Sequence, residues 1–185
     1  MNAPDFVDAF GAKYSAAVAD ERPGSAASEF VFAPQGERFR DGLLVSVRDG
    51  VDWNGIFARG ETSSCGLFGT PDPQGLLVLS YGNAYLVSIR SPNMYSTLES
   101  PWILGALPVP EAETLVVYNS ESFWGIGASG VRWKNETDAD GFEALKVEGL
   151  LVTGAMRLPW ERDARLQLDA RTGKLLSGAL QKRFK

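Results

Sequence analysis

The chain has 185 residues, of which 44% are hydrophobic and 22% charged, a balance that is typical of globular proteins and excludes general disorder. Its 23 acidic and 18 basic residues give a net charge of −5, and an acidic surface repels phosphate backbones, so no nucleic-acid partner is expected. Twenty glycines and ten prolines favour short strands and turns over a helix bundle, and we expect one mainly β domain over residues 1–185.

The first 24 residues are expected to form an N-terminal helix and a linker to the β-rich body. Their apolar residues recur every three to four positions, which places them on one helix face. These residues are Phe6, Val7, Phe10, Tyr14, Ala17 and Val18. Asn2 suits the N-cap, and Pro23 and Gly24 end the segment.

The expected location is the cytoplasm. The N-terminal residues lack the basic and apolar regions of a secretory signal, and no apolar run approaches the roughly 20 residues of a membrane span, so no membrane partner is expected. The single cysteine, Cys65, cannot form a disulfide within the chain, which is typical of a reducing compartment.

The body, residues 28–185, is expected to consist of strands joined as antiparallel hairpins, because its apolar residues alternate or form short runs. One hairpin is predicted over residues 75–89, with its turn at Gly82 and Asn83. Two more are predicted over residues 142–156 and 164–180.

A Leu-Val pair recurs along this body at a spacing near 36 residues. Its leucines are separated by 33, 38 and 36 residues, and they are Leu44, Leu77, Leu115 and Leu151. The second and third copies align further without a gap, which sets Tyr85 over Phe123. A repeat of this length suits units of three or four brief strands, as in a propeller-like fold. The alternative is a sandwich or open barrel in which the pair recurs by chance.

Residues 52–55, Asp-Trp-Asn-Gly, combine an aromatic ring with a carboxylate and an amide, a mixture that sugar sites use. With a second carboxylate nearby, Asp52 and Glu61 are the candidate acid and base of a glycoside hydrolase. A further alternative is a non-catalytic carbohydrate-binding module that uses Trp53 and Trp160.

The chain contains no histidine, which removes the commonest general base and the commonest zinc ligand. Ser64 and Cys65 lie in a Gly-rich stretch, but there is no histidine to activate either, and the stretch matches neither a nucleophile elbow nor a Walker phosphate-binding loop. We therefore expect no metal, no cofactor and no catalytic residue, with the two carboxylates above as the alternative.

Residues 91–113 form a long proline-rich connection. Four prolines prevent a continuous helix or a central strand, and long ordered loops are often functional. The segment carries Tyr95 and Trp102, and a later loop carries Trp160 and Arg162. These four side chains suit interface anchors, so they are the candidate partner-binding residues. The alternative is that the aromatic rings pack beneath their own loop.

The C-terminal half resembles a group of bacterial proteins. Residues 125–156 and the Leu-Asp-x-x-Thr-Gly hairpin at residues 168–173 are similar to stretches in uncharacterised bacterial β-rich proteins. In that group a short strand, Gly-Val-x-Trp, an Asp-Gly turn and this hairpin follow one another. The resemblance implies no particular activity.

These features favour a protein that binds another protein over a catalyst. The most specific form of the hypothesis is an immunity or antitoxin-like protein that masks the active site of a toxin. Small acidic proteins without catalytic residues suit this role, and an acidic surface docks readily on a basic protein partner. The glycoside hydrolase and the carbohydrate-binding module remain the alternatives.

Overall fold

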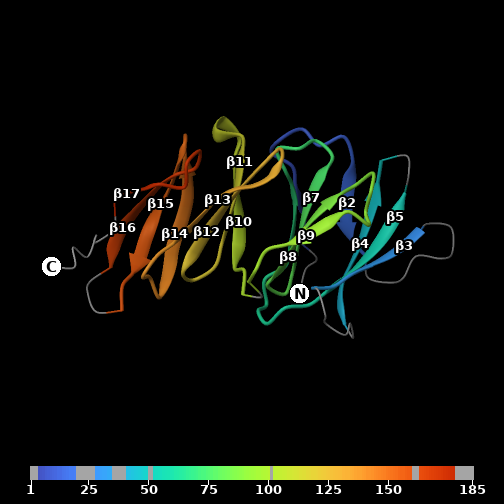
Figure 1. The fold of residues 1–185 in the computed structure, drawn as a ribbon, viewed down its shortest axis with the longest axis horizontal. Coiled ribbons are helices and arrows are strands. Elements are labelled where there is room, and N and C mark those ends of the chain that lie inside the picture. Colours follow the sequence, from blue (N-terminus) through green and yellow to red (C-terminus); the bar gives the residue numbers. More distant parts are fainter. Residues whose placement is uncertain are drawn as a thin grey trace. The chain divides into compact units, whose positions relative to one another are not determined.

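The computed structural model describes residues 4–19, 28–34, 41–49, 52–100, 102–159 and 163–177. Within these ranges the chain forms seventeen strands in four sheets and one short 3-10 helix, Pro110–Ala112 (Figure 1). The predicted fold class, mainly β and built from antiparallel hairpins, is confirmed. The chain divides into two compact units, Met1–Gly105 and Ala106–Lys185, and each is described by itself. The single domain expected from the length stays a prediction.

The predicted N-terminal helix is wrong over the residues that the structure describes. Residues 4–19 contain two short strands, β1 (Phe6–Val7) and β2 (Ser15–Val18). Between them the Asp8 carboxylate accepts hydrogen bonds of 3.0 to 3.1 Å from three successive backbone N–H groups. Such local side-chain bonding competes with helix formation, and the apolar residues are buried by strand pairing instead. The rest of the predicted segment, residues 1–3 and 20–24, lies outside the described residues.

The first unit contains two sheets. One has the strand order β2-β4-β5-β3, and its further members are β3 (Ser28–Phe32), β4 (Gly42–Arg48) and β5 (Trp53–Ala58). The other has the order β1-β6-β7-β8-β9, with β6 (Gly66–Gly69), β7 (Gly75–Ser80), β8 (Asn83–Ser88) and β9 (Tyr95–Thr97). β1 pairs with β6 and β3 pairs with β5 in parallel. The N-terminal segment therefore contributes one strand to each sheet.

The second unit contains two sheets whose strands follow one another in chain order. The first comprises β10 (Gly105–Val109), β11 (Thr114–Tyr118), β12 (Ser122–Gly127) and β13 (Gly130–Glu136). The second comprises β14 (Gly141–Glu148), β15 (Leu151–Arg157), β16 (Ala164–Asp169) and β17 (Leu175–Ser177). The predicted hairpins over residues 142–156 and 164–177 are therefore confirmed, and the last three residues of the second one lie outside the described residues.

The Leu-Val repeat marks one interior strand in every sheet. Its four copies lie in β4, β7, β11 and β15, each of which has a strand on either side. The valine of each pair has 0% exposure, and these residues are Val45, Val78, Val116 and Val152. An interior strand is covered on its sides by its neighbours, and its apolar side chains fill the space between sheets. Each copy of the repeat therefore corresponds to one sheet.

In the first unit a buried tryptophan joins the two sheets. Trp53 of β5 donates its indole N–H to the carbonyl of Ile89, just after β8, at 2.9 Å. The Tyr85 hydroxyl of β8 donates in return to the carbonyl of Ala58 at 2.8 Å. These bonds satisfy the polar atoms of two large rings inside an otherwise apolar core.

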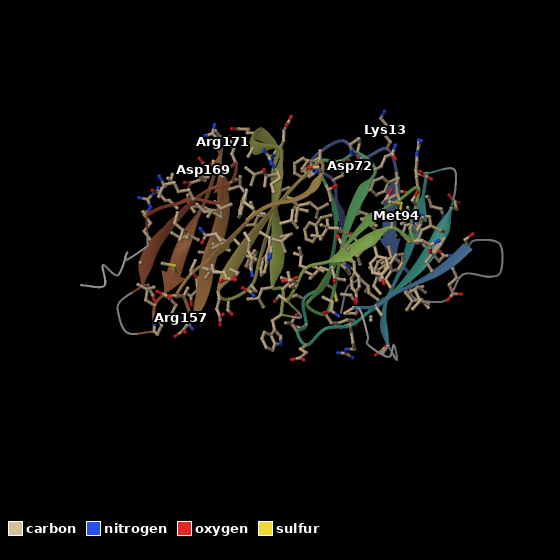
Figure 2. The ribbon with its side chains drawn as sticks, in the orientation of Figure 1. Lys13, Asp72, Met94, Arg157, Asp169 and Arg171 are labelled. Atoms are coloured by element: carbon tan, nitrogen blue, oxygen red, sulfur yellow. The ribbon has the colours of Figure 1, made fainter. Side chains whose placement is uncertain are left out.

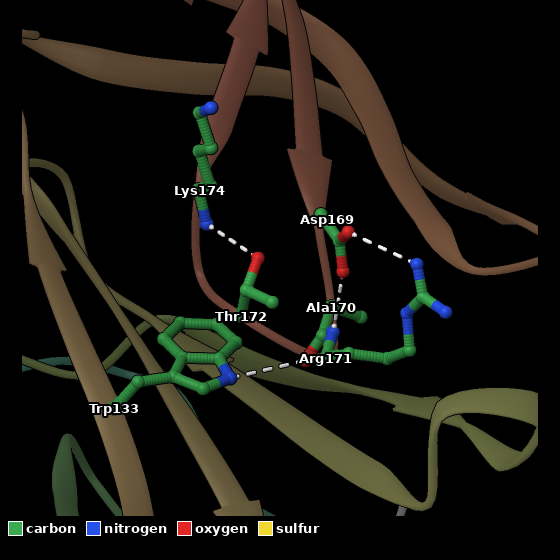
Figure 3. Close-up of polar contacts among 6 residues, drawn as sticks. All are labelled: Trp133, Asp169, Ala170, Arg171, Thr172 and Lys174. Atoms are coloured by element: carbon green, nitrogen blue, oxygen red, sulfur yellow. Dashed lines mark hydrogen bonds and ion pairs between the residues drawn. The ribbon is translucent and has the colours of Figure 1, made fainter.

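The second unit has a comparable connection from β13 to the turn after β16. Trp133 donates its indole N–H to the Ala170 carbonyl at 3.0 Å (Figure 3). The ring also fills the space over two glycines: a Cβ atom would lie 2.1 Å from it at Gly125 and 2.5 Å from it at Gly173. Because Gly173 has a φ of +69°, a larger residue there would be strained by its backbone as well.

The turn that receives Trp133 is held by its own carboxylate. Asp169 accepts hydrogen bonds from the backbone N–H of Arg171 at 2.9 Å and from its guanidinium at 3.3 Å (Figure 2, and closer in Figure 3). Burial of Asp169 would raise its pKa, but the hydrogen bonds and charge of Arg171 outweigh burial and hold the pKa below its usual value. Asp169 therefore stabilises the turn on which Trp133 packs.

We expect Trp133→Phe to lower the free energy of unfolding by about 1–3 kcal/mol, because phenylalanine cannot donate to the buried Ala170 carbonyl. Trp102→Phe is the matched control, since that indole lies at the surface, and its effect should stay below about 0.5 kcal/mol. Urea unfolding followed by circular dichroism measures both changes. Equal losses in the two variants would contradict a structural role for the Trp133 hydrogen bond.

Candidate binding surface

The structure separates the predicted partner-binding residues. Trp102 is 55% exposed and donates its indole N–H to the Glu61 carboxylate at 2.7 Å. Tyr95 lies opposite Val87 near the far end of β8, where its hydroxyl donates to the Ala33 carbonyl at 2.9 Å. Its ring also packs edge-on against a buried phenylalanine, so Tyr95 is largely structural. Trp160 and Arg162 lie outside the described residues.

The structure does not bring the candidate hydrolase carboxylates together. Asp52 precedes β5 and forms an ion pair with Arg48 at 3.4 Å, whereas Glu61 follows β5 at its other end. A strand of this length separates its ends by roughly 17 Å, and glycosidase carboxylates lie about 5–10 Å apart. Trp53 is 2% exposed and cannot stack on a sugar. The roles predicted for Asp52 and Glu61 as an acid–base pair, and for Trp53 as a sugar platform, are therefore wrong.

Three segments meet beside the turn between β7 and β8. Residues 60–64 and 80–82 are joined by backbone hydrogen bonds of 2.8 to 3.2 Å, from Gly60 to Ser80, from Thr62 to Tyr81 and from Gly82 to Ser64. The third segment is fixed by Ile103, which is buried and donates its N–H to the Gly82 carbonyl at 2.9 Å. This bonding fixes the relative positions of the three backbone segments that carry the flanking side chains.

We call the side chains that these segments present the Trp102 surface. It consists of Glu61, Tyr81, Trp102 and Leu104. Leu104 is 44% exposed, Glu61 is exposed and Tyr81 is half-buried. The sequence predicts Trp102 as a binding residue and Glu61 as an alternative catalytic residue. It does not predict the contact between these two side chains, which lie 41 residues apart in the sequence. Tyr81 and Leu104 were missed.

Tyr81 occupies a strained position. Ser80 pairs with Asn83, so the two turn residues are Tyr81 and Gly82, one position earlier than predicted. Their φ angles are 49° and 100°, the positive pair that a type I′ turn requires. Asn or Gly normally fills the first of these positions, because other side chains crowd the carbonyl there. An aromatic residue at the first turn position is the signal that could have identified this site from the sequence.

The Tyr81 ring is covered by Arg59. The guanidinium carbon of Arg59 lies 4.4 Å from the ring centroid, and the same guanidinium forms an ion pair with Asp41 at 3.4 Å. Aromatic rings attract cations over their faces, and the carboxylate completes the neutralisation of the charge. Arg59 is thus paired with both a ring and a carboxylate of its own unit.

The net charge of the chain arises in the unit that carries this surface. Residues 1–105 contain twelve acidic and seven basic residues, whereas residues 106–185 contain eleven of each. The first unit therefore accounts for the whole net charge of −5. Its field favours the approach of a cationic ligand.

The described residues also bear on whether the chain holds a metal site or a reactive buried group. No group of three or more His, Cys, Asp or Glu residues gathers there in a way that could hold a metal ion. The Tyr14 hydroxyl donates to the Gly75 carbonyl at 2.6 Å, and burial, followed by the charges of Asp8 and Asp72, raises its pKa well above the usual value. This phenol is therefore a structural donor. In the same ranges no helix has the length and apolar character needed to cross a bilayer.

Comparisons with known proteins do not place the chain in a family. No family model and no curated protein matches it. It is similar to the N-terminal domain of Nup159, with a TM-score of 0.45 and 10% identity over 95% of this chain and 53% of that chain. It is also similar to a chain in the S. cerevisiae complex of a Dbp5 variant with Nup159, a Gle1 variant, IP6 and ADP, with a TM-score of 0.43 and 10% identity over 96% of this chain and 52% of that chain. The chain thus spans about half the length of these solved chains, and likeness at this level identifies neither family nor function.

We expect Tyr81→Asn to raise the free energy of unfolding by about 0.5–1 kcal/mol, because asparagine relieves the left-handed strain while the lost contact with Arg59 offsets part of the gain. Tyr81→Phe keeps both the ring and the strain, so its midpoint of thermal unfolding should match that of the parent chain. Calorimetry compares the three proteins. A lower midpoint for Tyr81→Asn than for Tyr81→Phe would show that the tyrosine is not strained.

Proposed function

We propose that this chain is a non-catalytic protein that acts by binding another protein through the Trp102 surface. The observation that carries the proposal is the half-exposed indole of Trp102, held in one orientation by Glu61 at 2.7 Å. Tryptophan and tyrosine are the residues that most often dominate binding energy at protein interfaces. A ring that is already fixed loses little conformational freedom on binding.

The partner that this surface suits is a basic protein. The acidic first unit would attract it from a distance, and apolar Leu104 beside Trp102 would be buried in the contact. The more specific form of the proposal is an immunity or antitoxin-like role, in which the surface covers the active site of a basic toxin. Supporting this form are the acidic charge and the lack of histidine.

The test begins with capture of the partner by the tagged chain from lysate of the source organism, washed at low and then at moderate salt. The captured protein is identified, purified and titrated by calorimetry. Trp102→Ala is expected to weaken its binding by at least about 30-fold, which corresponds to roughly 2 kcal/mol. Binding should also weaken as salt rises, because charge attracts the two proteins.

Val131→Ala is the matched control, since Val131 is exposed but belongs to β13 in the other unit, and it should leave the affinity unchanged. Tyr81→Asn provides a variant that cannot fail by unfolding, and it should bind more weakly although it is more stable. Full affinity in both Trp102→Ala and Tyr81→Asn would overturn the proposed surface. For the more specific form, the captured partner must be a toxin whose activity this chain inhibits.

A further inference from the structure

We propose that the pair of Trp102 and Glu61 receives an arginine side chain of the partner protein. The inference rests on the proposed function and names the chemical group that the same surface recognises. It starts from the hydrogen bond of 2.7 Å between the indole N–H and Oε2 of Glu61. That bond uses one acceptor position of a carboxylate that has about four, and it leaves the ring more than half exposed.

Glu61 differs from the other carboxylates near β5. Asp52 forms an ion pair with Arg48, and Asp41 forms one with Arg59. Among the residues that the structure describes, Glu61 has no cationic partner, although it lies in the acidic unit. A carboxylate held beside an exposed indole is therefore available for a cation from outside the chain.

A second pair of an aromatic ring and a carboxylate, Tyr81 and Asp41, already binds a guanidinium of the chain itself. There the Arg59 guanidinium lies between an aromatic ring, Tyr81 at 4.4 Å, and a carboxylate, Asp41 at 3.4 Å. Trp102 and Glu61 supply an aromatic ring and a carboxylate without the guanidinium. The chain thus shows, a few residues away, which group such a pair accepts.

Arginine fits this pair better than lysine does. Its guanidinium is planar, so it can stack on an indole face and present N–H groups to a carboxylate in the same plane at once. The lysine ammonium is a compact, strongly hydrated charge that lacks this planar geometry. A sugar could stack on Trp102, but it would gain nothing from the net negative charge of the unit.

The experiment measures the indole N–H resonance of Trp102 in the full chain by ¹⁵N–¹H correlation spectra, with the resonance assigned from its loss in Trp102→Phe. The probes are hexapeptides rich in arginine, in lysine, or in citrulline, which keeps the shape of arginine without its charge. The arginine peptide should shift the resonance saturably, with a Kd at least tenfold lower than that of the lysine peptide. The citrulline peptide should not shift the resonance.

Glu61→Gln tests the carboxylate, because glutamine can still accept the indole N–H bond but carries no charge. Glu61→Gln should lower the affinity for the arginine peptide at least tenfold. Asp52→Asn, which changes an exposed carboxylate at the other end of β5, should leave that affinity unchanged. Equal affinity for arginine and lysine peptides, an unchanged affinity in Glu61→Gln, or a saturable shift with cello-oligosaccharides instead would overturn the inference. If no peptide binds while Trp102→Ala still abolishes capture of the partner, the arginine inference fails and the proposed function stands.

Discussion

In each unit of this protein one indole N–H donates to a carbonyl in the turn that follows a strand of the other sheet. Trp53 donates to Ile89 at 2.9 Å and Trp133 donates to Ala170 at 3.0 Å, across 36 and 37 residues of sequence. Apolar burial brings two sheets together without direction, but a buried N–H must meet its acceptor at one position. The hydrogen bond therefore favours one position of each sheet relative to its partner sheet. In the second unit, Gly125 leaves room for the Trp133 ring.

The loops at the turn between β7 and β8 are joined by backbone hydrogen bonds. Three segments far apart in the chain bond to one another there, and they carry an exposed indole and a tyrosine in a left-handed backbone conformation. Exposed aromatic rings and backbone strain both work against stability, and their coincidence on one surface is the main support for the proposed binding role. The acidic charge of the same unit would favour cationic groups as ligands of the proposed binding surface.

The sequence alone determined the class of the fold and the spacing of about 36 residues at which the Leu-Val pair recurs. Short apolar runs with period two, divided by Gly-rich turns, predict antiparallel strands. The recurring Leu-Val pair, from Leu44 to Leu151, predicted a repeat, and the structure places each copy in an interior strand of a different sheet, because a strand paired on both edges needs apolar side chains. The helix predicted for the N-terminal segment was wrong, because apolar residues spaced by three or four positions also fit two short strands joined by a turn at Asp8.

Only the tertiary structure decided which tryptophan is structural and which is available for binding. Trp53 and Trp102 both stand in polar, turn-like stretches of sequence, yet the first is buried and the second is exposed. The partners that settle this are Ile89 and Glu61, 36 and 41 residues away, and no local pattern encodes such pairs. The extended strand β5 separates Asp52 from Glu61. Glu61 instead meets Trp102, because side chains far apart in sequence come together according to sheet order and turn geometry, which arise only when the whole unit folds.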